Sequence, residues 1–107
     1  MKSLTSQQKI IFENIIEEAI VDCYGEDEQI SGWMCFLDDK ISTPHNCLIG
    51  KEHAILEKID MDEGSRSILG IIKVNKMKIR MPLQDVILEN LELMEYLKAY
   101  TYWLRGY

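Results

Sequence analysis

Six carboxylates in the N-terminal part of the sequence have the type and spacing to bind a hard metal cation. Their order along the chain is Asp22, Glu26, Asp27, Glu28, Asp38 and Asp39. Two unit charges about 5 Å apart repel each other by roughly 3 kcal/mol at an effective dielectric constant near 20, so such a cluster either stays solvated or binds a cation. Ca²⁺ prefers about six to eight oxygen ligands and tolerates irregular geometry, so it fits this set better than softer metals. A solvated helix face is the alternative interpretation.

A second acidic group consists of Asp60, Asp62 and Glu63 and is followed by Gly64. The order resembles an EF-hand loop, but counting from Asp60 the glycine is the fifth residue, whereas the motif has it at the sixth. The twelfth residue is Ile71, where the motif requires glutamate. We therefore interpret this group as an ordinary hairpin turn, with a non-EF-hand oxygen site as the alternative.

Zinc binding and nucleophilic catalysis have weaker support. The soft ligands are Cys23, Cys35, Cys47, His45 and His53, but no Cys-x-x-Cys pair occurs, and buried structural cysteines are the alternative. Three cysteines, an odd number, do not make a disulfide framework. The sequence has no glycine-rich phosphate loop and no nucleophile elbow. These observations predict a protein that is not an enzyme and has no catalytic residues.

The charges are segregated along a chain of 107 residues with a formal net charge of -6. Nine acids and no Lys or Arg lie between Ile10 and Asp39, whereas five bases and no acid lie between Gly64 and Leu83. The acidic balance disfavours direct binding to nucleic acid or to an anionic membrane. No run of about 18 apolar residues occurs and the N-terminus lacks a signal-peptide core, so we expect a cytoplasmic protein. Two solvated faces that attract each other on folding are the simplest interpretation of the segregation.

Two helices are predicted to carry the six carboxylates. The first begins at the capping box Thr5–Gln8 and carries an apolar stripe that includes Phe12, Ile16 and Ala19. We expect Gly25 to end it. The second extends from about Glu26 to Lys40, with acids that suit its positive N-terminal end. Gly32 weakens this second prediction by roughly 1 kcal/mol relative to alanine.

After Pro44 the pattern changes to short apolar or alternating runs. These runs predict four or five strands in a small antiparallel sheet or an SH3-like partial barrel, with a hairpin turn at Asn75–Lys76. Asp85 is expected to cap a last helix that extends to about Leu104, and the aromatic C-terminus is expected to dock on the core. The prediction is therefore a single α+β domain over residues 1–107, with two N-terminal helices, the sheet and a C-terminal helix.

The order of several short motifs carries a family resemblance. The motifs are Ile20-Val21-Asp22-Cys23-Tyr24-Gly25-Glu26-Asp27-Glu28, Gly32-Trp33, Leu37-Asp38-Asp39, Pro44, Met81-Pro82-Leu83, Tyr102-Trp103 and Arg105-Gly106-Tyr107. Over about residues 15 to 107, the chain resembles the small bacterial calcium-binding proteins first known from cyanobacteria, which do not use EF-hands. His45 follows the proline where that family typically has an aromatic residue.

The resemblance implies a compact fold of helices and sheet that binds or buffers intracellular calcium through acidic residues. It implies that Asp22, Glu26, Glu28, Asp38 and Asp39 are metal ligands and that Asp27 belongs with them. It also implies structural roles for Trp33, Pro82, Trp103 and Tyr107. A non-enzymatic calcium-binding protein, acting as a buffer or a sensor, is thus the first functional prediction. The alternative is an acidic interaction or inhibitor domain that uses the same face to bind a basic protein partner.

Overall fold

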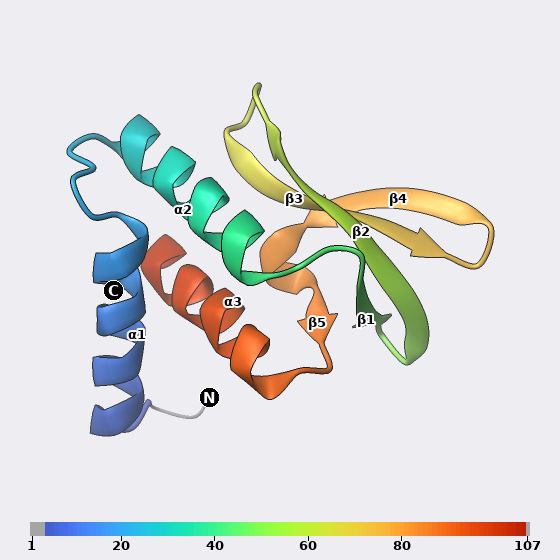
Figure 1. Ribbon diagram of the computed structural model, residues 1–107, viewed down its shortest axis with the longest axis horizontal. Helices are drawn as coiled ribbons and strands as arrows, with labels where there is room; N and C mark the ends of the chain where they lie inside the picture. The colour runs from blue at the N-terminus through green and yellow to red at the C-terminus, as the bar shows by residue number, and fades with distance from the viewer. Residues whose placement is uncertain (1–3, 107) are drawn as a thin grey trace.

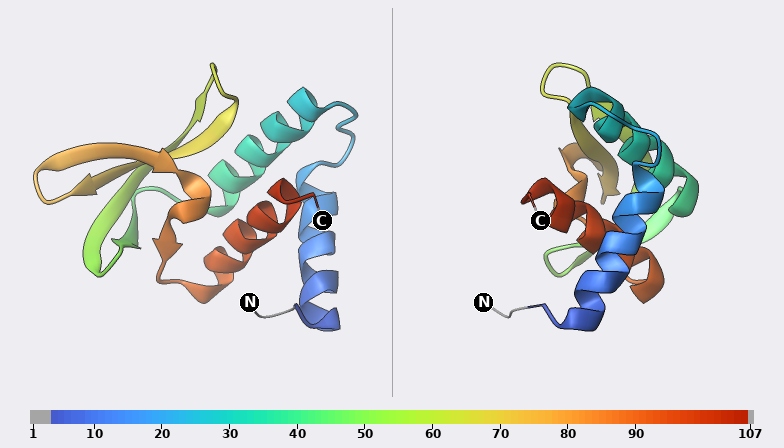
Figure 2. Two further views of the ribbon diagram at one scale, coloured as in Figure 1. Left: turned by 180° about the vertical axis from the view of Figure 1, so that it is seen from behind. Right: turned by 90° about the vertical axis from the view of Figure 1, so that its left-hand side faces the viewer.

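In the computed structural model, which describes residues 4–106, the second and third of three helices pack against a five-stranded sheet, and the first helix packs on these two at the end away from the sheet (Figure 1). The elements in chain order are α1 Ser6–Ala19, α2 Glu26–Lys40, β1 His45–Ile49, β2 Glu52–Asp62, β3 Ser67–Val74, β4 Met77–Pro82, the short 3₁₀ helix η1 Leu83–Asp85, β5 Ile87–Leu88 and α3 Leu91–Leu104. Seen from behind, the helices lie together at one end and the β3–β4 hairpin projects at the other (Figure 2). The predicted α+β class with N-terminal helices and a C-terminal helix is confirmed.

The sheet is antiparallel throughout, with the strand order β4-β3-β2-β1-β5. The register between β2 and β3 shifts between Leu56 and Lys58, and this bulge bends the long strand β2. Asn75–Lys76 forms the predicted two-residue turn, in which Asn75 has a φ of 56°. Strands β4 and β5 are the two edges, so each has one neighbouring strand.

The capping box at the start of α1 is confirmed, because the Thr5 hydroxyl accepts from the Gln8 amide and the Gln8 side chain accepts from the Thr5 amide. The predicted end of this helix at Gly25 is wrong. Helix α1 ends at Ala19, a turn follows in which Asp22 has a φ of 61°, and Gly25 is the N-cap residue of α2. The apolar periodicity continued into the turn because Ile20 still packs on the core after the helix has ended.

Helix α2 has the predicted bounds, and the structure gives a reason for the glycine within it. A Cβ atom on Gly32 would lie 2.7 Å from the carbonyl oxygen of Ala19 and 3.0 Å from Cys23 Sγ. The end of α1 therefore crosses α2 at a position where only a residue without a side chain fits. The close crossing outweighs the cost of glycine in a helix.

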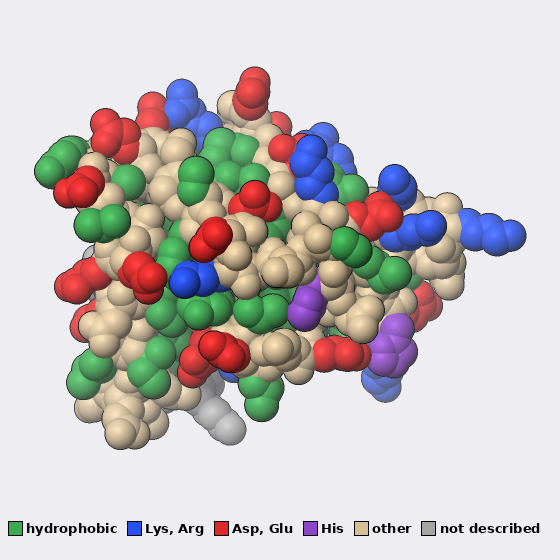
Figure 3. Space-filling model, in the orientation of Figure 1, with side chains coloured by type: hydrophobic (Ala, Val, Ile, Leu, Met, Phe, Trp, Pro, Cys, Tyr) green, Lys and Arg blue, Asp and Glu red, His purple; other side chains and the backbone are tan. Residues whose placement is uncertain are grey.

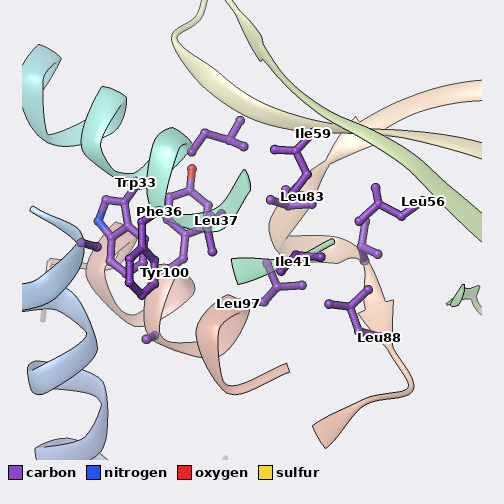
Figure 4. Close-up of a cluster of buried hydrophobic side chains, with 14 of the residues drawn as sticks. Trp33, Phe36, Leu37, Ile41, Leu56, Ile59, Leu83, Leu88, Leu97 and Tyr100 are labelled. Atoms are coloured by element: carbon purple, nitrogen blue, oxygen red, sulfur yellow. The ribbon is translucent and has the colours of Figure 1, made fainter. Parts of the chain in front are cut away.

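An aromatic cluster joins α2 to the C-terminal helix (Figure 4). Trp33 is fully buried, and its ring centroid lies 5.3 Å from that of Tyr100 and 5.9 Å from that of Trp103. Tyr96 makes an edge contact with Phe36 at 5.5 Å. The docking of the aromatic C-terminal segment on the core is thus confirmed, except at Tyr107, which lies outside the described residues.

The prediction that Asp85 caps the last helix is wrong. Asp85 belongs to η1, the short strand β5 follows it, and Asn90 is the N-cap residue of α3. The Asn90 side chain accepts a hydrogen bond from the Leu93 amide at 3.1 Å. The segment between Asp85 and Asn90 contains β5, and its buried residues Val86 and Leu88 lead directly into the apolar pattern of α3, so the sequence does not mark where the helix begins.

Candidate metal centre

Four of the six expected carboxylates lie at the junction of α1 and α2. Asp22 occupies the turn between the helices, and Glu26, Asp27 and Glu28 form the first turn of α2. All four side chains are exposed. Acids are favoured at this position because the backbone dipoles of a helix place partial positive charge at its N-terminus. We refer to these four residues as the junction carboxylates.

Asp38 and Asp39 lie at the opposite end of α2 and are exposed. Asp38 lies eleven positions after Asp27, which corresponds to about 16 Å along a helix axis. The structure therefore places four of the six carboxylates at one helix junction and leaves the other two at the far end of α2. Within residues 4–106, no three Asp, Glu, His or Cys side chains are gathered closely enough to hold a metal ion.

Two of the junction carboxylates already have partners. Asp27 Oδ1 forms an ion pair with Arg66 Nη1, which comes from the turn between β2 and β3. Glu28 Oε2 accepts a hydrogen bond from the Tyr24 amide at 3.2 Å. The first contact joins the β2–β3 turn to the start of α2, and the second closes the turn between the helices. A cation at the junction would compete with both contacts.

A hollow of about 550 Å³ lies beside this junction, between the start of α2, the β2–β3 turn and the end of α3. Its lining includes the oxygen-bearing side chains of Glu26, Asp27, Gln29 and Ser65. Such hard oxygen donors suit Ca²⁺ in their chemistry. Gln29 and Ser65 are not among the residues expected from the sequence. Gln29 is an uncharged neighbour of the acidic segment on α2, and Ser65 reaches the hollow only because the β2–β3 turn docks there.

The hairpin turn predicted at the second acidic group is present but begins later than predicted: Asp60 lies within β2, Asp62 ends that strand, and the turn spans residues 63–66. The Asp62 carboxylate accepts from Ser65 Oγ at 2.6 Å and from the Gly64 amide at 3.3 Å. The Ser65 bond lowers the pKa of Asp62 below its ordinary value, with smaller help from the Gly64 amide and the charge of Arg80. These bonds use both oxygens of Asp62 to hold the turn.

The cysteines do not converge on the histidines within the described chain. Cys47 is fully buried on β1, opposite Ala54 on one side and Leu88 on the other, whereas Cys35 is exposed. Burial raises the pKa of the Cys47 thiol, with a further contribution from the charge of Glu89. A thiol whose pKa is raised is a poor nucleophile and a poor metal ligand. The interpretation as a structural cysteine therefore applies to Cys47.

The comparisons with known proteins agree on one family and one fold. The sequence matches the model of the CcbP family, described as calcium binding, over residues 13–104. The crystal structure of Anabaena CcbP has a TM-score of 0.71 at 17% identity and covers 96% of this chain and 93% of that one. A calcium binding protein in its calcium-binding form has a TM-score of 0.74 at 21% identity and covers 97% and 98%. No curated protein sequence matches the chain significantly. The two solved structures show that the fold is shared.

Proposed function

The chain belongs to the CcbP family of calcium-binding proteins, and from that premise we propose that the junction carboxylates hold its Ca²⁺ ion. The observation that carries the proposal is the position of four exposed carboxylates within seven residues, Asp22 to Glu28, at one helix junction. This segment lies inside the matched range and supplies the hard oxygen ligands that Ca²⁺ prefers.

Binding would assemble the site rather than fill a finished one. The four side chains are not gathered in the structure, and Asp27 is paired with Arg66. A divalent ion would draw the carboxylates together because it removes their mutual repulsion, roughly 3 kcal/mol for each pair about 5 Å apart. Asp27 would exchange its contact with Arg66 for one with the ion, and the remaining ligands would be carbonyl oxygens and water.

Asp38 and Asp39 are proposed as a second and separate pair of calcium ligands. Their distance from the junction along α2 prevents them from sharing one ion with Asp27 in this arrangement of the helices. Two adjacent carboxylates supply fewer ligands than four, so a site at this pair should bind calcium more weakly than the junction.

We propose that the protein acts as an intracellular calcium buffer or sensor in the cytoplasm and not as an enzyme. The family is a calcium-binding one and not a family of enzymes. None of the described helices has the length and apolar character needed to cross a membrane. A sensor would have to change its conformation when it binds calcium. If calcium displaced Arg66 from Asp27, the β2–β3 turn would lose its contact with α2, and the binding event would be transmitted to the sheet.

The alternative function, an acidic domain that binds a basic protein, uses the same carboxylates. Two observations favour this alternative. All six carboxylates are exposed, and among the described ion pairs only the one between Asp27 and Arg66 involves any of the six. Complex formation that survives a chelator and weakens steeply with salt would support it. Retention of the partner only with calcium would instead support a sensor.

Titration calorimetry with matched variants tests the calcium site. The first variant combines Asp22→Asn with Glu26→Gln, and the second combines Asp38→Asn with Asp39→Asn, so both remove two charges. We expect the first variant to weaken the tighter binding step at least about tenfold, a loss of about 1.4 kcal/mol. The second variant should change the dissociation constant of that step by no more than about twofold, because Asp38 and Asp39 affect the junction only through long-range electrostatics.

Thermal melting gives the second readout. Calcium at about 100 times its dissociation constant should stabilise the wild-type protein by about 2.7 kcal/mol, and an excess of chelator should remove the effect. A melting temperature that does not change up to millimolar calcium, together with the absence of heat in the titration, would contradict the proposed function. Equal weakening by both variants would contradict the assignment of the ligands.

A further inference from the structure

We propose that the free edge of β4 binds an acidic, extended polypeptide segment as an additional strand of the sheet. The proposal concerns the end of the molecule opposite the helices and goes beyond calcium binding. Four cations lie on the β3–β4 hairpin, namely Lys73, Lys76, Lys78 and Arg80, and we refer to it as the basic hairpin. Lys and Arg side chains gather at this end of the surface (Figure 3).

The positions of the charges on the basic hairpin destabilise the hairpin itself. Lys73 on β3 lies directly opposite Lys78 on β4 in the antiparallel register. Like charges at directly opposed positions destabilise a sheet. Glu57 on β2 lies 3.3 Å from Lys78 and offsets part of this repulsion, and Asp62 interacts with the charge of Arg80, but the hairpin itself contains no acid between Gly64 and Leu83. Opposed lysines do not stabilise the fold, and a bound anionic partner is a role that they can serve.

Edge strands often carry lysine because charge prevents uncontrolled pairing with other chains. That explanation covers Lys78 and Arg80 on β4. It does not cover Lys73, because β3 is an interior strand with β2 on its other side. The positive charge therefore extends from the edge strand β4 onto β3 and forms a surface two strands wide. Such a surface is better suited to binding an anionic partner than to preventing uncontrolled pairing at the edge.

The backbone of β4 offers the matching hydrogen-bonding groups. The two-residue turn closes on the pair Val74 and Met77, which is a hydrogen-bonded pair in such hairpins. Hydrogen-bonded and non-hydrogen-bonded pairs alternate along an antiparallel ladder. The amide and carbonyl groups of Lys78 and Arg80 therefore point away from β3, toward the open edge. An added strand would pair with these groups, as in other complexes that extend a sheet.

The chemistry of the surface favours a polypeptide over nucleic acid or a membrane. Residues 45–88, which include the whole sheet, contain no Phe, Trp or Tyr. The sheet thus lacks rings on which bases could stack and the aromatic anchors typical of membrane interfaces. The net charge of -6 also repels long polyanions. A short strand with acids at alternate positions would place its carboxylates beside Lys78 and Arg80, which are two residues apart.

Fluorescence anisotropy with a labelled peptide tests the proposal. The probe is an acetylated and amidated peptide, Thr-Glu-Val-Glu-Val-Glu-Thr, at low salt. We compare the wild type with Lys73→Gln/Lys78→Gln and with the control Lys9→Gln/Lys98→Gln, which removes the same charge from exposed positions on α1 and α3. The hairpin variant should bind at least about tenfold more weakly, and the control within about twofold. Thermal melts establish that both variants are folded.

Two further measurements separate strand addition from charge attraction alone. The same peptide with N-methyl groups on alternate residues keeps its charge but loses backbone donors, and it should bind at least about tenfold more weakly. Hydrogen exchange should show that the peptide protects the Lys78 and Arg80 amides, which face the open edge.

Several outcomes would overturn the proposal. They are no binding up to about 1 mM peptide, equal weakening in the hairpin variant and the control, and undiminished binding of the N-methylated peptide. Tighter binding of a single-stranded oligothymidine, or of vesicles that contain phosphatidylglycerol, through the same lysines would assign the surface to a different class of partner. Calcium binding is measured separately, so its outcome does not decide this one.

Discussion

At the scale of single residues, Asp27 is the carboxylate for which Arg66 and the proposed calcium ion would compete. Its contact with Arg66 holds the β2–β3 turn against α2, and the proposed site requires the same oxygen. The two side chains are 71% and 58% exposed, so solvent screens the pair and its contribution to stability is below about 1 kcal/mol. At the proposed site, calcium would therefore displace Arg66 at a small cost.

The variant Arg66→Gln should bind calcium more tightly than the wild type. It removes the competitor for Asp27 and one positive charge beside the ion, and we expect the dissociation constant to fall about twofold to fivefold. Calorimetry at low salt measures the change. Lys78→Gln is the control, because it removes one charge from an exposed ion pair on the sheet, 3.3 Å from Glu57. Equal gains in the two variants would show that Arg66 has no specific effect.

Tyr100 provides a pH-dependent test of the aromatic core. Burial raises the pKa of its phenol to about 12, whereas the unfolded chain should have a value near 10. The folded state thus keeps a proton that the unfolded state loses, and stability present below about pH 10 declines as the pH rises toward 12. We expect urea denaturation to show a loss on the order of 2 kcal/mol. Tyr100→Phe should give a flatter profile, and an equally steep one would contradict this account.

At the scale of elements, the sequence predicted the elements well and their ends less well. The bounds of α2, the turn at Asn75–Lys76 and the capping box of α1 follow from local signals that the fold does not override. The ends at Ala19 and Asn90 could not be predicted, because an apolar residue that packs on the core lies just beyond each of them, Ile20 after α1 and Leu88 before α3. Tertiary packing, which local propensity does not report, decides where these helices stop.

The crossing of α1 over α2 predicts the effect of Gly32→Ala. Helix propensity alone would favour alanine by about 1 kcal/mol. The added methyl group would meet the Ala19 backbone at 2.7 Å, so the helices must separate, and overpacking typically costs about 1–3 kcal/mol. We expect a net loss of about 1–2 kcal/mol in chemical denaturation. The control Gly64→Ala has no neighbour closer than 3.7 Å and should be nearly neutral. A stabilised Gly32→Ala protein would show that the crossing is looser than described.

At the scale of the whole molecule, the segregation of charge along the sequence persists in space. The acids of residues 10–39 lie on α1, α2 and the turn between them, and the bases of residues 64–83 lie on the strands and turns of the sheet. Among the described ion pairs, Arg66 with Asp27 is the one that joins the two sets. The two oppositely charged sets of residues therefore attract each other through this one described ion pair. The opposite ends of the molecule remain available for a cation and for an acidic partner.

The candidate site shows the same limit of sequence analysis. The sequence identified the acidic residues and, through the family resemblance, the class of ligand, which the family match confirms. It could not separate Asp38 and Asp39 from the junction, because that separation depends on the length and direction of α2 in the fold. Nor could it find Ser65, which reaches the hollow only through the docking of the β2–β3 turn.

Calcium titration followed in ¹H–¹⁵N correlation spectra tests the location of the ion most directly. At substoichiometric calcium, the amides of residues 22–28 and of the β2–β3 turn beside them should shift first. Signals of the β3–β4 turn at the far end of the sheet should stay in place. Earliest shifts at Asp38 and Asp39, or uniformly small shifts over the whole chain, would contradict a calcium site at the junction of α1 and α2.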